Sequence, residues 1–97
     1  MLQHYIFIRY REGTAEAHIA EFAARMLALR TVIPELAHLE LGRDILHEAR
    51  SWDLILIMRF ASLDALRCYQ RHEAHQQVMQ FNQSCVADVG SLDFFAP

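Results

Sequence analysis

The sequence has 97 residues, 54% hydrophobic and 22% charged, which predicts one globular domain with a single core. The net charge of -3 and the scatter of the nine arginines exclude the concentrated basic surface that nucleic acid requires. The absence of lysine excludes Schiff-base chemistry and the usual attachment of pyridoxal phosphate. We expect no cofactor and no nucleic-acid partner.

The first ten residues, MLQHYIFIRY, lack the basic leader and the small-residue cleavage site of a signal peptide. The longest aliphatic run, LILIM, is too short to cross a bilayer. We therefore expect a cytoplasmic protein without a membrane partner. Cys68 and Cys85 are too few for a disulfide framework or a zinc cluster, so both are expected to be small buried hydrophobes.

Residues 4–10, HYIFIRY, alternate two sets of side chains and predict a strand that is largely apolar on both faces. The stretch EGT predicts a turn, with Thr14 as the N-cap of an amphipathic helix that must end before Pro34. The apolar side of this helix carries Ile19, Phe22, Ala23, Met26 and Ile33. We expect that side to pack on a sheet.

Two more strands are predicted at residues 38–46 and 52–60, as an antiparallel pair joined by the polar stretch HEARS. Ile55 and Ile57 lie on one face of the later strand. The opposite face of that strand carries Trp52, Leu54, Leu56, Met58 and Phe60. Both faces of the predicted sheet are therefore expected to be covered.

Ser62 is predicted to cap a second helix that carries Tyr69, and residues 73–85 continue helically after a break. Residues 86–95 are predicted as a last strand interrupted by Gly90. The order βαββαβ, with an extra helical segment, predicts the α+β class and the ferredoxin-like split βαβ arrangement. In that arrangement a four-stranded antiparallel sheet has its helices on one face. We assign residues 1–97 to one such domain.

The second face of the sheet predicts a homodimer. Tyr5 and Phe7 in the first strand repeat the two-sided pattern of Ile55 and Ile57, and the helices can cover only one face. The simplest cover is the same face of another copy, in a two-fold contact. The alternative, scattered exposed apolar residues on a monomer, explains the repeated pattern less well.

Five segments in register resemble the stress-responsive dimeric α/β-barrel family, called Dabb: HYIFIRYREGT, IPEL, ELGRD, WDLILIMRFASLDALRCYQRHEAHQQV and SLDFF. The resemblance spans nearly the whole chain. It implies a homodimer in which two ferredoxin-like sheets face each other as a barrel with the helices outside. Most members of that family have no established activity, and one plant member closes a linear polyketide by an aldol condensation without a cofactor.

The resemblance to the plant cyclase implies three catalytic residues. Its histidine in the family segment HPAH matches His75 of HEAH, and its tyrosine six residues earlier matches Tyr69. The histidine near the start of its first strand matches His4. The chain departs from that enzyme at three other positions: Leu54 replaces a histidine, Met26 an aromatic residue and Glu73 the proline of HPAH.

The stretch YQRHEAHQQV is compatible with a site on physical grounds. His75 shares a helical face with Val78 and Met79, and a histidine against apolar surface favours its neutral form, which can accept a proton. Tyr69 could hold a developing enolate oxygen through its hydroxyl. The alternative is that both are core residues with satisfied hydrogen bonds, which we would prefer on a helix without the family resemblance.

The remaining histidines and charged residues are expected to be structural. His72 is assigned to a helix end, while Arg43 and Asp44 are expected to pair. HEAH has its histidines three residues apart, one fewer than the zinc-protease HExxH, so no metal site is predicted. The remaining histidines are assigned to surface or turn positions: His18, His38 and His47.

Two functions remain open. One is a cofactor-free lyase or cyclase, or a related oxygenase or isomerase, that acts on a small, mostly apolar, enolisable molecule between sheet and helices. In it His75 would be the base and Tyr69 its partner. The other is a non-catalytic dimer that binds a small molecule or contributes to stress tolerance. The residues expected to contact the ligand are Phe22, Met26, Leu54, Leu56, Met58 and Val78.

Overall fold

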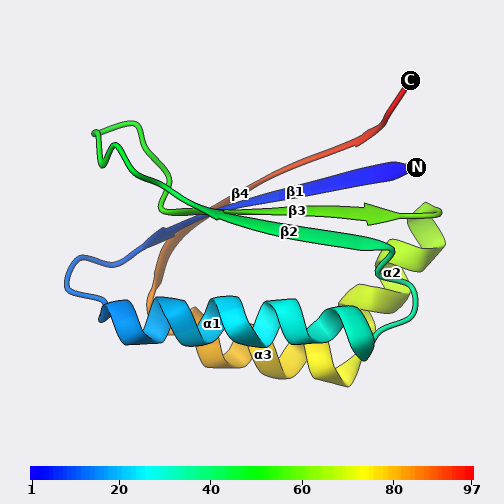
Figure 1. The fold of residues 1–97 in the computed structure, drawn as a ribbon, viewed down its shortest axis with the longest axis horizontal. Helices are drawn as coiled ribbons and strands as arrows, with labels where there is room; N and C mark the ends of the chain where they lie inside the picture. Colours follow the sequence, from blue (N-terminus) through cyan, green and yellow to red (C-terminus); the bar gives the residue numbers. More distant parts are fainter.

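The computed structural model describes residues 1–97 as one sheet with all helices on one side (Figure 1). The strands are ordered β2-β3-β1-β4 and every neighbouring pair is antiparallel. This confirms the ferredoxin-like arrangement. The elements in chain order are β1 (Leu2–Tyr10), α1 (Glu16–Ala28), a short 3-10 helix (Leu29–Thr31), β2 (His38–Arg43), β3 (Leu54–Phe60), α2 (Leu63–Arg71), α3 (Glu73–Gln83) and β4 (Val86–Phe95).

The core lies between the helices and the sheet face that they cover. The side chains of β3 that point toward the helices are at most 2% exposed: Leu54, Leu56, Met58 and Phe60. Phe22 and Met26 of α1 are fully buried in the same cluster. Since burying one such side chain stabilises the fold by about 1.5 to 3 kcal/mol, this alternation fixes which face of β3 meets the helices.

The opposite face, which we call the open face, carries no helix (Figure 1). The register pairs Tyr5 of β1 with Ile57 on one side and Leu92 on the other, so one apolar row crosses three strands. Phe7 pairs with Ile55 in the next row, and Phe94 lies 5.5 Å from Tyr5, ring to ring. Leu92 is 55% exposed in the single chain. The two-sided apolar pattern of the sequence is therefore present in the fold.

Trp52 lies on the open face, and the prediction that placed it with Leu54 toward the helices was wrong. The strand begins only at Leu54, so alternation does not extend back to Trp52. Its ring lies 5.9 Å from that of Phe7, and the Arg9 guanidinium is 4.5 Å above it. A Cβ at Gly90, opposite Phe7, would come within 3.2 Å of the indole, so this glycine leaves room for Trp52.

Two predictions about element ends need correction. Thr14 is not the N-cap of α1: that position is Ala15, and the Thr14 hydroxyl instead donates to the carbonyl of Arg11 within the turn. Strand β4 is not interrupted at Gly90, and its irregular register lies opposite the end of β1. Ser62 does cap α2, because its side chain accepts from the backbone N–H of Ala65.

Charged and sulfur-containing side chains differ in part from expectation. Arg43 pairs with Glu16 of α1 at 2.8 Å, whereas Asp44 accepts from a backbone N–H in its own turn. The predicted Arg43–Asp44 pair was therefore wrong, because α1 places a carboxylate beside the end of β2. Cys68 is exposed and Cys85 is half-buried, whereas both were expected to be buried.

None of the helices combines the length and apolarity needed to cross a bilayer.

Candidate functional site

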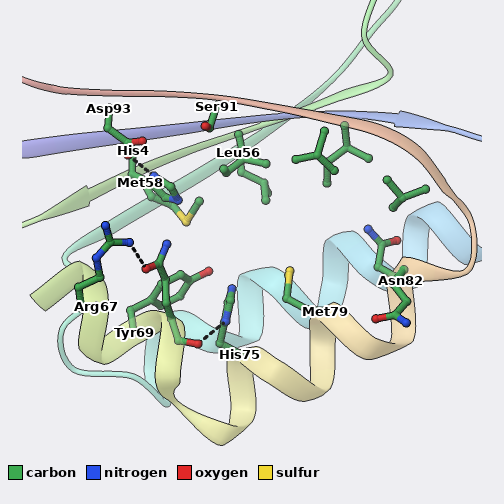
Figure 2. Close-up of a pocket in the computed structure, with 16 residues that line it drawn as sticks. His4, Leu56, Met58, Arg67, Tyr69, His75, Met79, Asn82, Ser91 and Asp93 are labelled. Carbon is green, nitrogen blue, oxygen red and sulfur yellow. Dashed lines mark hydrogen bonds and ion pairs between the residues drawn. The ribbon is translucent and has the colours of Figure 1, made fainter. Parts of the chain in front are cut away.

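A cavity of about 590 Å³ lies between α2 and α3 and the helix-facing side of β1, β3 and β4 (Figure 2). Its walls are largely apolar, and polar side chains line its two ends and its rim. The lining residues that matter for the chemistry are His4, Tyr69, His75, Asn82, Asp93 and Arg67. This combination of an apolar wall and a few convergent polar groups is typical of a small-molecule site.

The break between α2 and α3 orients His75. His72 ends α2 and caps α3, with its Nδ1 accepting from the backbone N–H of Ala74, so it is the helix-end residue that we expected. The last turn of α2 leaves carbonyls without helical partners, and the carbonyl of Gln70 lies 3.2 Å from His75 Nδ1. Because a carbonyl only accepts, Nδ1 carries the proton and Nε2 keeps its lone pair.

The electrostatic setting of His75 suits a proton acceptor. Burial lowers the pKa of His75 below its ordinary value of 6.5, and the bond to Gln70 opposes this shift only in part. The neighbouring imidazole of His4 also lowers the pKa. His75 is therefore neutral at neutral pH, and its Nε2 can accept a proton.

Tyr69 supplies a hydrogen-bond donor beside this base. Its ring is 1% exposed and lies 4.4 Å from the His75 ring and 5.1 Å from Phe60. Burial raises the pKa of Tyr69, so its hydroxyl stays protonated at neutral pH. The Tyr69 hydroxyl has no hydrogen-bond partner in the protein. Every fully buried side-chain N or O atom of this chain does have a partner, so the Tyr69 oxygen is not fully buried and lies at the cavity surface. Figure 2 shows it directed into the cavity.

His4 and Asp93 form a pair on the sheet side of the cavity (Figure 2). The register of β1 and β4 places the two residues opposite each other, and His4 Nδ1 contacts a carboxylate oxygen of Asp93. The His4 side chain is 8% exposed and that of Asp93 is 43% exposed. The carboxylate accepts the Nδ1 proton, which leaves His4 Nε2 free.

The cavity brings together all three residues predicted as catalytic: His4, Tyr69 and His75. Of the six predicted ligand contacts, Leu56 and Met58 line it. The other four belong to the packed core and do not line it: Phe22, Met26, Leu54 and Val78. Phe22 and Met26 do not line the cavity because α1 packs against β2 and α3, whereas the cavity lies under α2 and α3.

Asp93 and Asn82 are lining residues that the sequence reasoning missed. Alternation in SLDFF places Asp93 on the same face as Ser91, but its pairing with His4 depends on the register of two strands at opposite ends of the chain. Asn82 lies on the same helical face as His75, a signal that helical spacing contained. His18, which was assigned to the surface, instead contacts Asn82 and stacks on Phe81 at 4.6 Å.

The lowered pKa of His75 predicts an acid-sensitive contribution to stability. Below its ordinary value of 6.5, the unfolded chain binds a proton at this residue more readily than the folded chain. The free energy of unfolding therefore falls as the pH drops through that value toward the lowered pKa. When the pH is lowered from about 7.5 to about 5, the melting temperature of the wild type should fall further than that of His75→Gln. Equal drops would contradict the lowered pKa.

Several solved structures share this fold over nearly their whole length. A dimeric ferredoxin-like protein of unknown function from Thermobifida fusca has a TM-score of 0.88 and 21% identity, over 98% of this chain and 90% of its own. A hydroxynitrile lyase from Passiflora edulis has a TM-score of 0.87 and 15% identity, over 99% of this chain and 93% of its own. These likenesses define the class as a ferredoxin-like α+β domain. No curated protein matches the sequence.

The family follows from the sequence itself. The profile of the Dabb family, described as the stress responsive A/B barrel domain, matches residues 2–96. The chain therefore belongs to the Dabb family, which confirms the resemblance seen in its five segments. A Dabb family protein from Mesorhizobium loti has a TM-score of 0.81 and 16% identity, over 99% of this chain and 96% of its own.

Proposed function

We propose that the protein is a cofactor-free enzyme of the lyase or cyclase type that acts on a small, mostly apolar, enolisable carbonyl compound. The observation that carries this proposal is the His75 imidazole, fixed through Nδ1 by the Gln70 carbonyl, with a free Nε2 at an apolar cavity. His75 removes the proton next to the substrate carbonyl, and the Tyr69 hydroxyl donates a hydrogen bond to the enolate oxygen that forms.

The His4–Asp93 pair gives the site a second proton carrier. The Asp93 carboxylate holds the Nδ1–H of His4, which fixes the tautomer and orients Nε2 as the proton-accepting atom, the arrangement found in hydrolase triads. His4 lies on the sheet side of the cavity, while His75 and Tyr69 approach from the helices. His4 can therefore accept a proton from the substrate, or return one to it, on a different side from His75.

The proposal also includes a homodimer formed through the open face. Tyr5, Phe7 and Ile57 lie on that face beside the exposed Leu92, without any helix to cover them. The Thermobifida fusca neighbour is described as dimeric, which supports the same assembly here. A second copy provides an apolar surface of matching shape through a two-fold axis. The cavity lies on the other side of the sheet, so dimerisation leaves it accessible.

The test of the catalytic proposal is proton exchange on a simple ketone. We expect the wild-type protein to accelerate exchange of the hydrogens next to the carbonyl of undecan-2-one in D2O, followed by proton NMR. Removal of such a hydrogen requires only a base and a donor to the carbonyl oxygen, the two groups assigned to His75 and Tyr69. Exchange no faster than in protein-free buffer, at saturating ketone, would contradict the proposal.

A non-catalytic binding or stress-tolerance dimer is the second candidate. It is favoured by one observation: the Tyr69 ring is packed between Phe60 and His75 as tightly as a core residue. In that case the same ketone would bind without any faster exchange. Binding measured by calorimetry beside the exchange assay separates the two functions.

A further inference from the structure

Asn82 is a buried amide at the end of the cavity farthest from Tyr69 (Figure 2). It lies in the last turns of α3 and is 3% exposed. Its Oδ1 accepts from the Tyr10 hydroxyl at 2.7 Å and lies 3.1 Å from His18 Nε2. These two partners come from β1 and α1, so two further elements meet α3 at this side-chain oxygen.

The two partners fix the orientation of the amide. Burial raises the pKa of Tyr10 to about 12, so its hydroxyl keeps the proton that it donates. His18 is held in place because its ring stacks on Phe81 at an interplanar angle of 13°. With Oδ1 occupied by these two groups, the Nδ2 group is turned away from both of them.

The Asn82 Nδ2 group is a donor without a protein partner. It makes no hydrogen bond within the chain. Because every fully buried side-chain N or O atom of this chain has a partner, Nδ2 is not fully buried and reaches the cavity surface. Figure 2 shows the Asn82 side chain directed toward the cavity. The wall beside it is apolar, formed by Ile8 and Val86 among others. A polar donor costs free energy in such a wall unless it gains a partner there.

We propose that Asn82 is a specificity-determining residue whose Nδ2 group donates a hydrogen bond to an oxygen at the far end of the ligand. This rests on the proposed function only in taking the cavity as the ligand site. Two side chains outside the cavity, Tyr10 and His18, hold the amide in the donating orientation. The ligand class is therefore an apolar molecule with a carbonyl at its reacting end and a second oxygen acceptor at its other end.

The helix sets the spacing between the two ends of the ligand. His75 and Asn82 are seven residues apart on α3, which is two turns, so both lie on one face at a separation of about 10 Å along the axis. Met79 lies between them and lines the apolar middle of the cavity. A linear aliphatic chain with its reacting carbon at His75 and an oxygen about 10 Å further along spans this distance. Shorter bifunctional molecules reach only one end.

Two ketones that differ by one oxygen test the inference. Undecane-2,10-dione carries two carbonyls separated by seven methylene groups, a chain chosen to span the rise of about 10 Å over seven helical residues, whereas undecan-2-one has only one carbonyl. We expect calorimetry to show that wild-type protein binds the diketone about tenfold more tightly, since one well-placed hydrogen bond contributes on this order. Equal affinities, or failure of both ketones to bind, would overturn the inference without any variant.

Asn82→Asp is the sharpest variant. Its carboxylate still accepts from Tyr10 and His18, so both contacts that hold this side chain are kept, but the atom facing the cavity becomes an acceptor. The preference for the diketone should disappear in this variant and persist in Gln80→Glu, the same chemical change at an exposed position of α3. A retained preference in Asn82→Asp would overturn the assignment.

The outcome is distinguishable from that of the proposed function. Proton exchange reports His75 and Tyr69, whereas the affinity ratio of the two ketones reports Asn82. A diketone preference without exchange would support Asn82 as a binding determinant and sink the catalytic proposal. Faster proton exchange with equal affinities for the two ketones would support the catalytic proposal and overturn the role of Asn82.

Discussion

His75→Ala should abolish most of the accelerated proton exchange, with a loss of about a hundred-fold or more, while the protein stays folded. The imidazole is half-buried at a cavity, and its one protein hydrogen bond is to the Gln70 carbonyl at the end of α2. That carbonyl can bond to water entering the enlarged cavity, so truncation leaves no unsatisfied group in the core. Exchange rates by NMR and thermal melts by circular dichroism measure both effects.

A matched control distinguishes the base from any other histidine. His47 is an exposed histidine with a φ of +53°, a conformation that asparagine tolerates, so His47→Asn removes an imidazole without strain. This control should retain wild-type exchange. If His75→Ala instead costs about 1 to 3 kcal/mol of stability and the exchange rate does not change, His75 is a packing residue.

The strands and their faces were predictable because period-two alternation is a local signal. In β3, Leu54, Leu56 and Met58 alternate with Ile55 and Ile57, and the structure places the two sets on opposite faces. Alternation fails where a strand has not yet begun, which is why Trp52 was assigned to the wrong face. The start of a strand depends on its hydrogen-bonded partner, and this information is not contained in a short window of sequence.

The cavity was only partly predictable, for a different reason. Periodicity identifies a buried side chain, but it does not distinguish burial in a packed core from burial beside a cavity. Phe22 and Leu56 are equally apolar and buried, yet only Leu56 lines the cavity, because Phe22 belongs to α1, which packs against β2 and α3, whereas the cavity lies under α2 and α3. Asp93 was missed because its contact with His4 spans 89 residues and depends on strand register.

Ile57→Glu should dissociate or unfold the proposed dimer. Ile57 lies at the middle of β3 on the open face, paired with Tyr5 of β1 and Glu40 of β2. If a second copy covers this face, the new carboxylate is buried without a partner, beside an existing acidic residue. Light scattering of the wild type at micromolar concentration should give about twice the 11.3 kDa chain mass.

The variant should give the monomer mass or a lost melting transition, because the open face would then be exposed to water or the chain would not fold. Val32→Glu introduces the same charge at a half-exposed apolar position after the 3-10 helix, away from the sheet, and should stay dimeric. A wild-type monomer would remove the dimer from the proposal. A dimer of unchanged strength in Ile57→Glu would place the interface elsewhere, because an unpaired carboxylate in an apolar contact between two sheets weakens that contact by several kcal/mol, on the order of a thousand-fold in affinity.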